Sequence, residues 1–275
     1  MARRFYTLAE WWHLLSLDAP TVAGIWSAFF VRAMHLHLSL IQSMLLPLGT
    51  WLLYVTDRIL DGLRQPQGAP LRERHHFHAR HRTAFLCAAA FLAVVLIWSI
   101  LKHMNPEAFR EDSWIGTLAL LYLFAVHRVA AQRLPKELAV AILFAAATAV
   151  PAWSRLNSSN GFAKEHLAPA VVFFSLLCWI NCAGIEKWEG GTPHAMTRWA
   201  SLHLRPIATI IALFSLTGAV LSPSRGLSAV YLAALLSSGL LFALDTRSAR
   251  LSPLHLRIAA DAALLTPLAF FPFAR

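Results

Sequence analysis

Several stretches of about 20 residues in this chain contain no charged side chain, and they constrain its fold more than any other feature. An α-helix needs roughly 20 apolar residues to cross the hydrocarbon core of a bilayer. Charge-free stretches of about that length separate Arg82 from Lys102, Glu137 from Arg155, Glu165 from Glu186, Arg205 from Arg225, and Arg225 from Asp245. The spacing of the charges therefore predicts transmembrane helices.

The composition excludes an ordinary soluble domain. Hydrophobic residues make up 57% of the 275 residues, charged residues only 14%, and the mean hydropathy is +0.55. A soluble domain is about one quarter charged, and a disordered chain contains far less apolar material. The apolar runs are also too long and continuous for the strands of a membrane barrel. We predict an all-α polytopic membrane protein, a bundle of about nine transmembrane helices.

The expected helices form a single transmembrane domain over residues 1–275. Within it, residues 1–17 carry Arg3, Arg4, Trp11 and Trp12, a composition typical of a helix lying on the membrane surface. The nine spans are expected at 18–33, 37–57, 83–102, 114–130, 136–154, 167–186, 204–222, 227–244 and 256–272.

The basic residues predict the orientation of these spans. The formal net charge is +10, from 24 Lys and Arg against 14 Asp and Glu. If the N-terminus is cytoplasmic, 17 of the 24 basic residues fall on the cytoplasmic side and 7 on the other. Cytoplasmic loops of membrane proteins carry such an excess. We therefore expect a cytoplasmic N-terminus, a C-terminus on the opposite side and, from this bias, a bacterial inner membrane. The positive charge indicates topology and anionic lipids or substrates, and no nucleic acid.

The first candidate site is the segment TWLLYVTDRILDGLR, at the cytoplasmic end of the second expected span. Asp57 and Asp61 are four residues apart, so both carboxylates lie on one helix face, with Arg64 one turn further. Two convergent carboxylates suit Mg²⁺, which takes one or two of them together with substrate phosphate oxygens. The alternative is a helix end whose carboxylates pair with Arg58 or Arg64.

The second candidate site is LCWINCAGIEKWEGG, where the sixth expected span ends. Asn181 lies inside the apolar run, and Glu186 and Glu189 are three residues apart. Polar groups at this depth are candidates for function, although a solvated boundary anchored by tryptophans is the alternative. Asp261, near the cytoplasmic end of the last span, is a secondary candidate that could pair with Arg257.

Two basic segments are also candidates. In HRVAAQRLPKELAV, Arg133 and Lys136 gather positive charge at the start of a helix, where anions are already favoured, although membrane anchoring explains them equally well. In LRERHHFHARHR, histidines are interspersed with arginines, which favours a basic interfacial helix over a metal site.

The arrangement of these motifs resembles the UbiA-type superfamily of intramembrane prenyltransferases. In that family, aspartate-rich motifs end the second and sixth spans and bind Mg²⁺ and an isoprenyl diphosphate. The first family motif reads roughly N-D-x-x-D-x-x-x-D; its last two aspartates match Asp57 and Asp61, and its first two positions are Leu53 and Tyr54 here. The second reads roughly D-x-x-x-D, and its nearest counterparts are Asn181, or Glu186 with Glu189.

The resemblance implies Mg²⁺-dependent transfer of a prenyl group from a polyprenyl diphosphate to an aromatic or other lipophilic acceptor within the membrane. It implies that Asp57, Asp61 and Glu186 are catalytic, that the metal is held by Asp57, Asp61, Asn181, Glu186 and Glu189, and that the diphosphate is bound by Arg64, Arg133, Lys136, Lys187 and Asn181. Tyr54, Arg257 and Asp261 are of second rank.

The sequence departs from the family at both motifs, because the first is incomplete and the second lacks aspartate. These departures are compatible with one Mg²⁺ in place of two, with an altered substrate, or with loss of transferase activity. A terpene cyclase on the same scaffold, which needs no external acceptor, is one alternative. A non-enzymatic membrane carrier or lipid-binding protein, whose charged helix ends only set topology, is the other.

Overall fold

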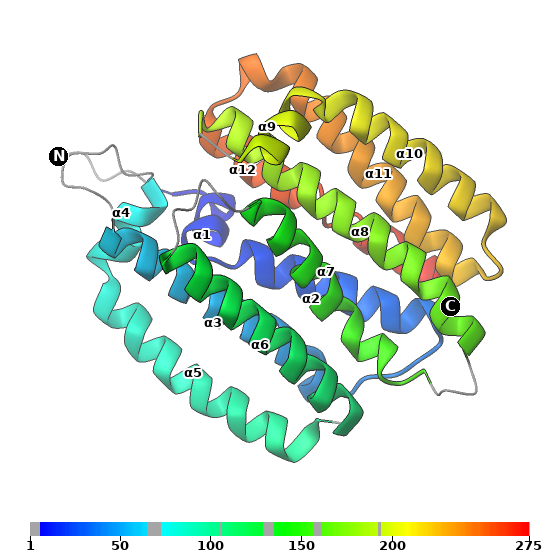
Figure 1. The fold of residues 1–275 in the computed structure, drawn as a ribbon, viewed down its shortest axis with the longest axis horizontal. Coiled ribbons are helices and arrows are strands. Elements are labelled where there is room, and N and C mark those ends of the chain that lie inside the picture. Colours follow the sequence, from blue (N-terminus) through cyan, green and yellow to red (C-terminus); the bar gives the residue numbers. More distant parts are fainter. Residues whose placement is uncertain are drawn as a thin grey trace. The chain divides into compact units, whose positions relative to one another are not determined.

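The computed structural model describes residues 6–64, 73–104, 106–128, 135–156, 161–191 and 194–274, and these residues contain helices and no strand. By its contacts the chain divides into two compact units. Unit 1 comprises Met1–Gly24 and Ser39–Met104, and unit 2 comprises Ile25–Leu38 and Asn105–Arg275. The boundary between Gly24 and Ile25 falls inside one helix, α2 (Asp18–Ala33). Figure 1 labels the helices along the chain.

Unit 1 is built from two long helices and three shorter helical segments. They are α1 (Leu8–Leu14), the start of α2, α3 (Leu40–Arg64), α4 (Glu73–Arg80) and α5 (Arg82–His103). The long helix α3 packs against α4 and α5, and α1 packs against α4. A capping box begins α1: Thr7 Oγ1 accepts from the Glu10 backbone N–H, and a Glu10 carboxylate oxygen lies 2.7 Å from the Thr7 backbone nitrogen.

The start of α2 is set by a sharp turn and a close helix contact. The axes of α1 and α2 differ by 92°. Ser16, between them, has a φ of 59°, in the left-handed region that makes such a reversal possible. Further along α2, a Cβ on Gly24 would lie 2.8 Å from Cγ of Pro47 in α3, so only glycine allows this approach of the two helices.

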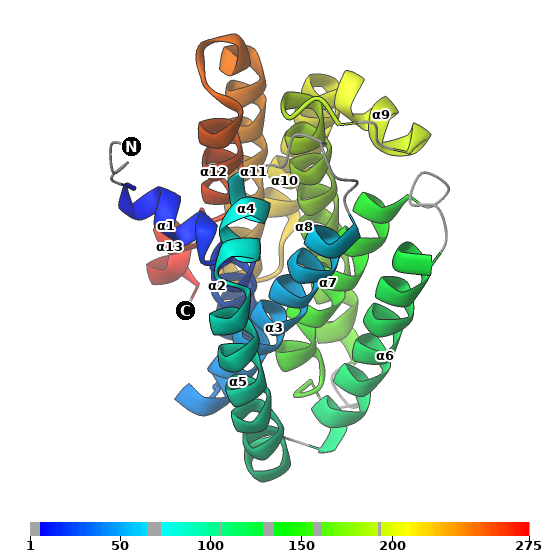
Figure 2. The ribbon, with the colours of Figure 1, turned by 90° about the vertical axis from the view of Figure 1, so that its left-hand side faces the viewer.

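Unit 2 is organised around the long helix α8 (Gly161–Trp188). It packs against α7 (Lys136–Trp153), α9 (Ala195–Leu202), α10 (Leu204–Leu221), α11 (Arg225–Arg247) and α12 (Pro253–Ala262). Both ribbon views show α10 and α11 side by side along α8 (Figures 1 and 2). Unit 2 also contains α6 (Pro106–Arg128), which packs on α7, and the short helices η3 (Ser248–Arg250), α13 (Pro267–Phe270) and η4 (Phe271–Phe273).

Aromatic side chains fill the centre of unit 2. Trp26 and Phe30 on α2 are fully buried against Phe174 of α8, and the rings of Trp26 and Phe174 stack with centroids 4.2 Å apart. The indole N–H of Trp26 donates to the carbonyl of Leu264, 2.7 Å away. Because this donor has a partner, the large indole is buried without the cost of an unpaired polar group.

The apolar helices support an integral membrane protein. Among the described residues, six segments are long and apolar enough to cross a membrane: Arg82–His103, Lys136–Trp153, Ala163–Trp188, Leu204–Leu221, Arg225–Arg250 and Pro253–Phe273. In α5, Phe85 and Ser99 are the buried residues, while Phe91, Trp98 and Leu101 are exposed. A helix with apolar side chains on every face and most of them exposed is suited to contact with lipid.

The expected spans agree with this structure in part. The ranges 83–102, 136–154, 167–186, 204–222, 227–244 and 256–272 coincide with the six candidates, although the last is broken into α12, α13 and η4. Residues 40–57 of the expected span 37–57 lie in α3, residues 114–128 of the expected span 114–130 lie in α6, and neither helix is among the six. The range 18–33 forms α2, which reaches the required apolar length only together with α1, as a bent pair that would raise the number to seven. Within the range 1–17, where a helix on the membrane surface is expected, Leu8–Leu14 form α1, and residues 1–5 lie outside the described part.

Candidate functional site

Polar side chains of unit 2 gather at the ends of its helices. Because neighbouring helices run in opposite directions, the starts of α7, α10 and α12 lie with the ends of α8 and α11. The described polar residues there are Lys136, Glu137, Asn181, Glu186, Lys187, Glu189, Thr197, Arg205, Asp245, Arg257 and Asp261. We call this set the polar end of unit 2.

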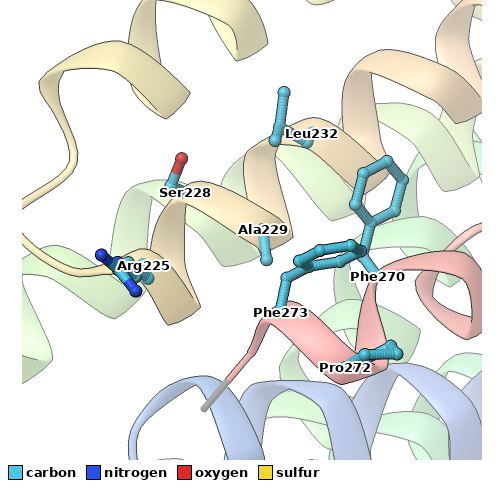
Figure 3. A pocket seen from close by; sticks show the side chains of 7 residues that line it. All are labelled: Arg225, Ser228, Ala229, Leu232, Phe270, Pro272 and Phe273. Carbon is cyan, nitrogen blue, oxygen red and sulfur yellow. The ribbon is translucent and has the colours of Figure 1, made fainter.

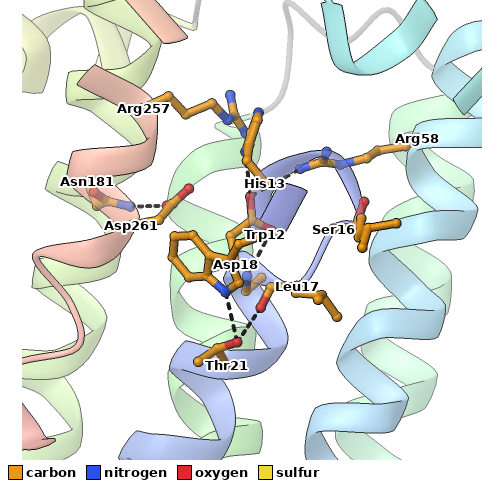
Figure 4. A network of polar contacts seen from close by, with 12 residues as sticks. Trp12, His13, Ser16, Leu17, Asp18, Thr21, Arg58, Asn181, Arg257 and Asp261 are labelled. Carbon is orange, nitrogen blue, oxygen red and sulfur yellow. Dashed lines mark hydrogen bonds and ion pairs between the residues drawn. The ribbon is translucent and has the colours of Figure 1, made fainter. Parts of the chain in front are cut away.

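Asn181 of α8 and Asp261 of α12 form the innermost pair of the polar end. The Asn181 side-chain N–H donates to Asp261 Oδ1 over 3.1 Å, as Figure 4 shows. Asn181 is only 5% exposed, and its Oδ1 makes no hydrogen bond. The structure thus brings together an amide from the second expected motif and a carboxylate that the sequence analysis placed in second rank.

Arg257 and Glu189 link the same two helices nearer the end of α8. Arg257 Nη1 lies 3.1 Å from Glu189 Oε1 and 3.2 Å from Oε2, and both side chains are close to nine-tenths buried. The sequence analysis suggested that Arg257 could pair with Asp261, and it expected Glu189 to be a metal ligand. In the structure the carboxylate of Glu189 is bound by Arg257, so it serves to hold α12 against α8.

Asp245, at the end of α11, is the most heavily paired carboxylate of the polar end. It is 2% exposed; Lys187 Nζ lies 2.7 Å and Trp188 Nε1 3.2 Å from its Oδ1, and Arg205 Nε lies 2.8 Å from its Oδ2. A buried carboxylate is stable only when such partners replace its water. Lys187, expected to bind diphosphate, is therefore engaged in joining α8 to α11.

The start of α7 supplies a further acid and base. Glu137 is 6% exposed and accepts from the Thr197 hydroxyl of α9 over 2.8 Å, while Lys136 Nζ lies 3.7 Å from Glu137 Oε1. Cys182, which follows Asn181, lies within range of the charges of four residues of the polar end: Lys136, Glu137, Glu186 and Asp261. Three expected site residues, Lys136, Asn181 and Glu186, therefore belong to one neighbourhood with Asp261.

Unit 1 contains a buried network of its own side chains at the turn between α1 and α2. Asp18, 1% exposed, has its Oδ2 2.9 Å from His13 Nδ1 and 3.6 Å from a guanidinium nitrogen of Arg58 on α3. The Arg58 guanidinium also lies over the Tyr54 ring, 4.1 Å from its centroid. Figure 4 draws these side chains. Tyr54 thus packs against a buried cation.

A second link of this network ties α4 to the same turn. His78 Nε2 lies 3.0 Å from Ser16 Oγ, and the His78 ring stacks on Phe85 of α5 at 4.2 Å. Burial, with help from the charge of Arg58, lowers the pKa of His78 from 6.5 to about 4. His78 is therefore neutral at physiological pH and acts as a packed hydrogen-bonding group.

The sequence analysis missed His13, Asp18, Arg58 and Asp245 as members of these networks. Asp18 and Asp245 each border an apolar run. Their position as single acids at the edge of an expected span could have marked them as candidates for buried ion pairs. The first expected motif is described only in part: Asp57 is a half-buried residue of α3 in unit 1, whereas Arg133 and the side chains of Asp61 and Arg64 lie outside the described residues.

A hollow of about 540 Å³ lies at the other end of unit 2, beside the start of α11. None of the expected site residues lines it; its walls are Arg225, Ser228, Ala229, Leu232, Phe270, Pro272 and Phe273 (Figure 3). Because Asp245 ends α11 and Arg225 begins it, the hollow and the polar end are separated by the length of that helix.

Fold and site together define an all-α membrane protein in which acids, bases and an amide, some buried and some exposed, gather where the apolar helices of unit 2 end. The chain matches no protein-family model, no curated protein sequence and no solved structure.

Proposed function

We propose that the protein is a Mg²⁺-dependent prenyltransferase that moves a prenyl group from a polyprenyl diphosphate to an aromatic or other lipophilic acceptor within the membrane. The observation that carries the proposal is the buried amide of Asn181, which is hydrogen-bonded to the half-buried Asp261 in the otherwise apolar helices of unit 2. Polar groups are costly inside a membrane and are retained mainly where they serve a substrate or an ion. The resemblance of the helix-end motifs to UbiA-type enzymes supports the same reaction.

The donor set of these residues fits Mg²⁺. This ion takes oxygen ligands and is commonly bound by one or two carboxylates together with substrate phosphates. Within unit 2, Asn181, Asp261 and Glu186 offer such oxygens, and the buried Asn181 Oδ1 makes no hydrogen bond to the described residues. Asp57 and Asp61 of unit 1 are carboxylates of the same type. When bound, Mg²⁺ would neutralise negative charge on the departing diphosphate.

The basic residues would hold the diphosphate. Lys136 begins α7 with its side chain partly exposed, which suits it to an anionic headgroup. We propose that Arg64 and Arg133 also bind phosphate, from their charge and their place in the sequence. As the allylic carbon–oxygen bond breaks, pyrophosphate leaves with the bonding electrons. An electron pair of the acceptor then forms the new bond, and the acceptor releases a proton. Stabilising the leaving group is where cations lower this barrier.

The proposal includes the arrangement in the membrane. Nine spans in a bacterial inner membrane, with the N-terminus cytoplasmic and the C-terminus on the opposite side, would place the polar end of unit 2 at the cytoplasmic face. The prenyl tail would then lie among the apolar helices and its diphosphate at the charged helix ends.

The test measures pyrophosphate released from a prenyl diphosphate by the full chain in detergent or nanodiscs, with and without Mg²⁺. We expect Mg²⁺-dependent release, and we expect Asp57→Asn to lower it at least about tenfold, the least that loss of a metal contact costs. Unaltered melting behaviour of the variant shows that it still folds. Equal release by Asp57→Asn and wild type would contradict the proposal.

The same assay separates the transferase from its relatives. Release that requires an added lipophilic acceptor identifies a transferase, whereas release without one, accompanied by a cyclic hydrocarbon or alcohol, identifies a cyclase. Absence of release with a series of prenyl chain lengths and acceptors would favour a carrier or lipid-binding protein.

A further inference from the structure

The hollow beside the start of α11 combines a basic side chain with apolar walls. Its volume of about 540 Å³ lies within the range of about 300–1,000 Å³ that is usual for small-molecule sites. Arg225 and Ser228 are its polar lining residues, and its large apolar ones are Leu232, Phe270 and Phe273 (Figure 3). A ligand suited to these walls has one polar and one apolar part.

The wall of the hollow that η4 forms is attached to the end of α2. Arg32 Nε donates to the carbonyl oxygen of Phe271 over 2.9 Å, and the Phe271 ring packs on Phe29 with centroids 5.3 Å apart. Phe271 lies between two lining residues, Phe270 and Pro272. The hydrogen bond from Arg32 therefore holds this side of the hollow in place within unit 2.

Two arginines flank the contact between α2 and α11 at this end of unit 2. Gly226 packs against the backbone of Ala33. Arg32 and Arg225 directly precede these two residues in the sequence. Neither arginine forms an ion pair with a described carboxylate, and the Arg225 guanidinium makes no hydrogen bond to the described residues. Two positive charges without an acidic partner in the described part of the chain favour an anion from outside it.

The surroundings of the hollow indicate where such an anion comes from. One candidate membrane span, Arg225–Arg250, begins at the hollow, and another, Pro253–Phe273, ends there. Phe273 is exposed, as are Val220 and Leu221 at the end of the neighbouring helix α10. The ends of spans lie at the level of the lipid headgroups, and exposed apolar side chains within spans contact acyl chains. The molecules next to this hollow are therefore membrane lipids.

We propose that this hollow binds one anionic phospholipid, whose headgroup phosphate accepts hydrogen bonds from Arg225. A guanidinium can donate two parallel hydrogen bonds to a phosphate, and the charge of Arg32 adds to the attraction. The acyl chain lies along Leu232, Phe270 and Phe273. By the expected topology, this lipid belongs to the leaflet that faces away from the cytoplasm. The site is separate from the polar end of unit 2 and does not depend on the proposed function.

The experiment adds phosphatidylglycerol to the purified full chain in a neutral detergent and measures bound lipid by native mass spectrometry. Phosphatidylcholine with the same acyl chains and inorganic phosphate are the comparison ligands. Wild type is expected to bind one phosphatidylglycerol at least about tenfold more tightly than phosphatidylcholine, whose choline cation would lie beside the two arginines. Inorganic phosphate, which has no tail, should not displace the lipid.

Two variants and a matched control test the residues. Arg225→Gln should lower the affinity for phosphatidylglycerol about tenfold and leave the melting temperature without lipid unchanged, because this exposed side chain has no partner among the described residues. Phe273→Ala should weaken both lipids by a similar factor, since it removes a contact to the tail. Arg247→Gln changes an exposed arginine at the other end of the same helix, outside the hollow, and should alter neither affinity.

Three results would show that the inference is wrong. Equal binding of the two lipids by wild type would mean that the hollow does not select an anionic headgroup. Equal effects of Arg225→Gln and Arg247→Gln would mean that only the overall charge attracts the lipid. Displacement of the lipid by inorganic phosphate would identify a simple anion site. Pyrophosphate release from a prenyl diphosphate is measured separately, so either proposal can fail while the other stands.

Discussion

Several polar pairs of unit 2 join residues that are far apart in the sequence. Asp245 binds Lys187 and Arg205, which are 58 and 40 residues distant, and Asn181 reaches Asp261 across 80 residues. Each pair joins two different helices. A buried carboxylate that loses such partners is strongly destabilising, which explains why each has more than one or is held by a neighbouring pair.

His78 offers a test of a buried group at the scale of one residue. Its pKa is lowered to about 4, first by burial and then by the charges of Arg58 and His81, while Asp18 opposes the shift. An unfolded histidine takes up a proton as the pH falls through about 6.5. Between about pH 6.5 and 4 the unfolded chain therefore binds the proton more readily than the folded one, and stability is lost over that window.

We expect the melting temperature of wild type to fall more steeply from pH 6.5 to 4 than that of His78→Gln. Glutamine can keep a hydrogen bond to Ser16 and does not titrate. The chain has 13 histidines, so the difference between the two proteins is the informative quantity. Parallel pH profiles would show that His78 is already free to protonate in the folded protein.

At the scale of helices, glycines decide how closely two elements can approach. Gly226, in the first turn of α11, faces the backbone of Ala33 at the end of α2: an added Cβ would lie 2.8 Å from the Ala33 Cα. The neighbour is backbone, which cannot turn aside as a flexible side chain can. This contact fixes α11 against the end of α2 within unit 2.

Gly226→Ala is expected to destabilise the protein by about 1–3 kcal/mol, the usual cost of overpacking. Gly239→Ala, in the same helix, is the control. Nothing lies within 4 Å of a Cβ at Gly239, so alanine should stabilise the helix by about 0.5–1 kcal/mol. Melting temperatures of the two variants in detergent check the difference. A loss of stability in both, or in neither, would contradict this account of the α2–α11 contact.

At the scale of the whole molecule, length and hydropathy identify six candidate membrane-spanning helices among the described residues, and the distribution of basic residues predicts their direction. Helices α10 and α11 form a hairpin whose connecting residues are expected outside the cytoplasm. Arg247, Arg250 and Arg257 follow α11 and are expected inside. The orientation can therefore be tested by measuring on which side of the membrane each loop lies.

A cysteine-labelling experiment tests this orientation on one helix. Pro223 precedes α11 and Ala249 follows it, and both are exposed. In a chain whose three native cysteines are replaced by alanine, a membrane-impermeant reagent added to intact cells should label Pro223→Cys directly. Ala249→Cys should be labelled only after permeabilisation. The opposite pattern would invert the topology, and labelling of both from outside would mean that α11 does not span.

Sequence reasoning located polar residues at the ends of helices, but it did not identify their partners. Asn181, Glu186 and Lys136 were chosen because they lie where an apolar run ends, and the structure places all three at the polar end of unit 2. The same reasoning predicted that Lys187 binds the substrate diphosphate and that Glu189 binds the metal, because a sequence shows a charge without showing its partner. Asp245 and Arg257 take those two side chains in the fold.

The sequence by itself determined the class of the protein and the approximate extent of its helices. Both depend on local properties: the hydropathy of about 20 consecutive residues and the position of charges at their ends. Only the tertiary structure decided the 92° turn between α1 and α2, the burial of Asp18 beside Arg58, and the pairing of Asn181 with Asp261. These depend on contacts between distant segments, whose geometry is set by how whole helices pack.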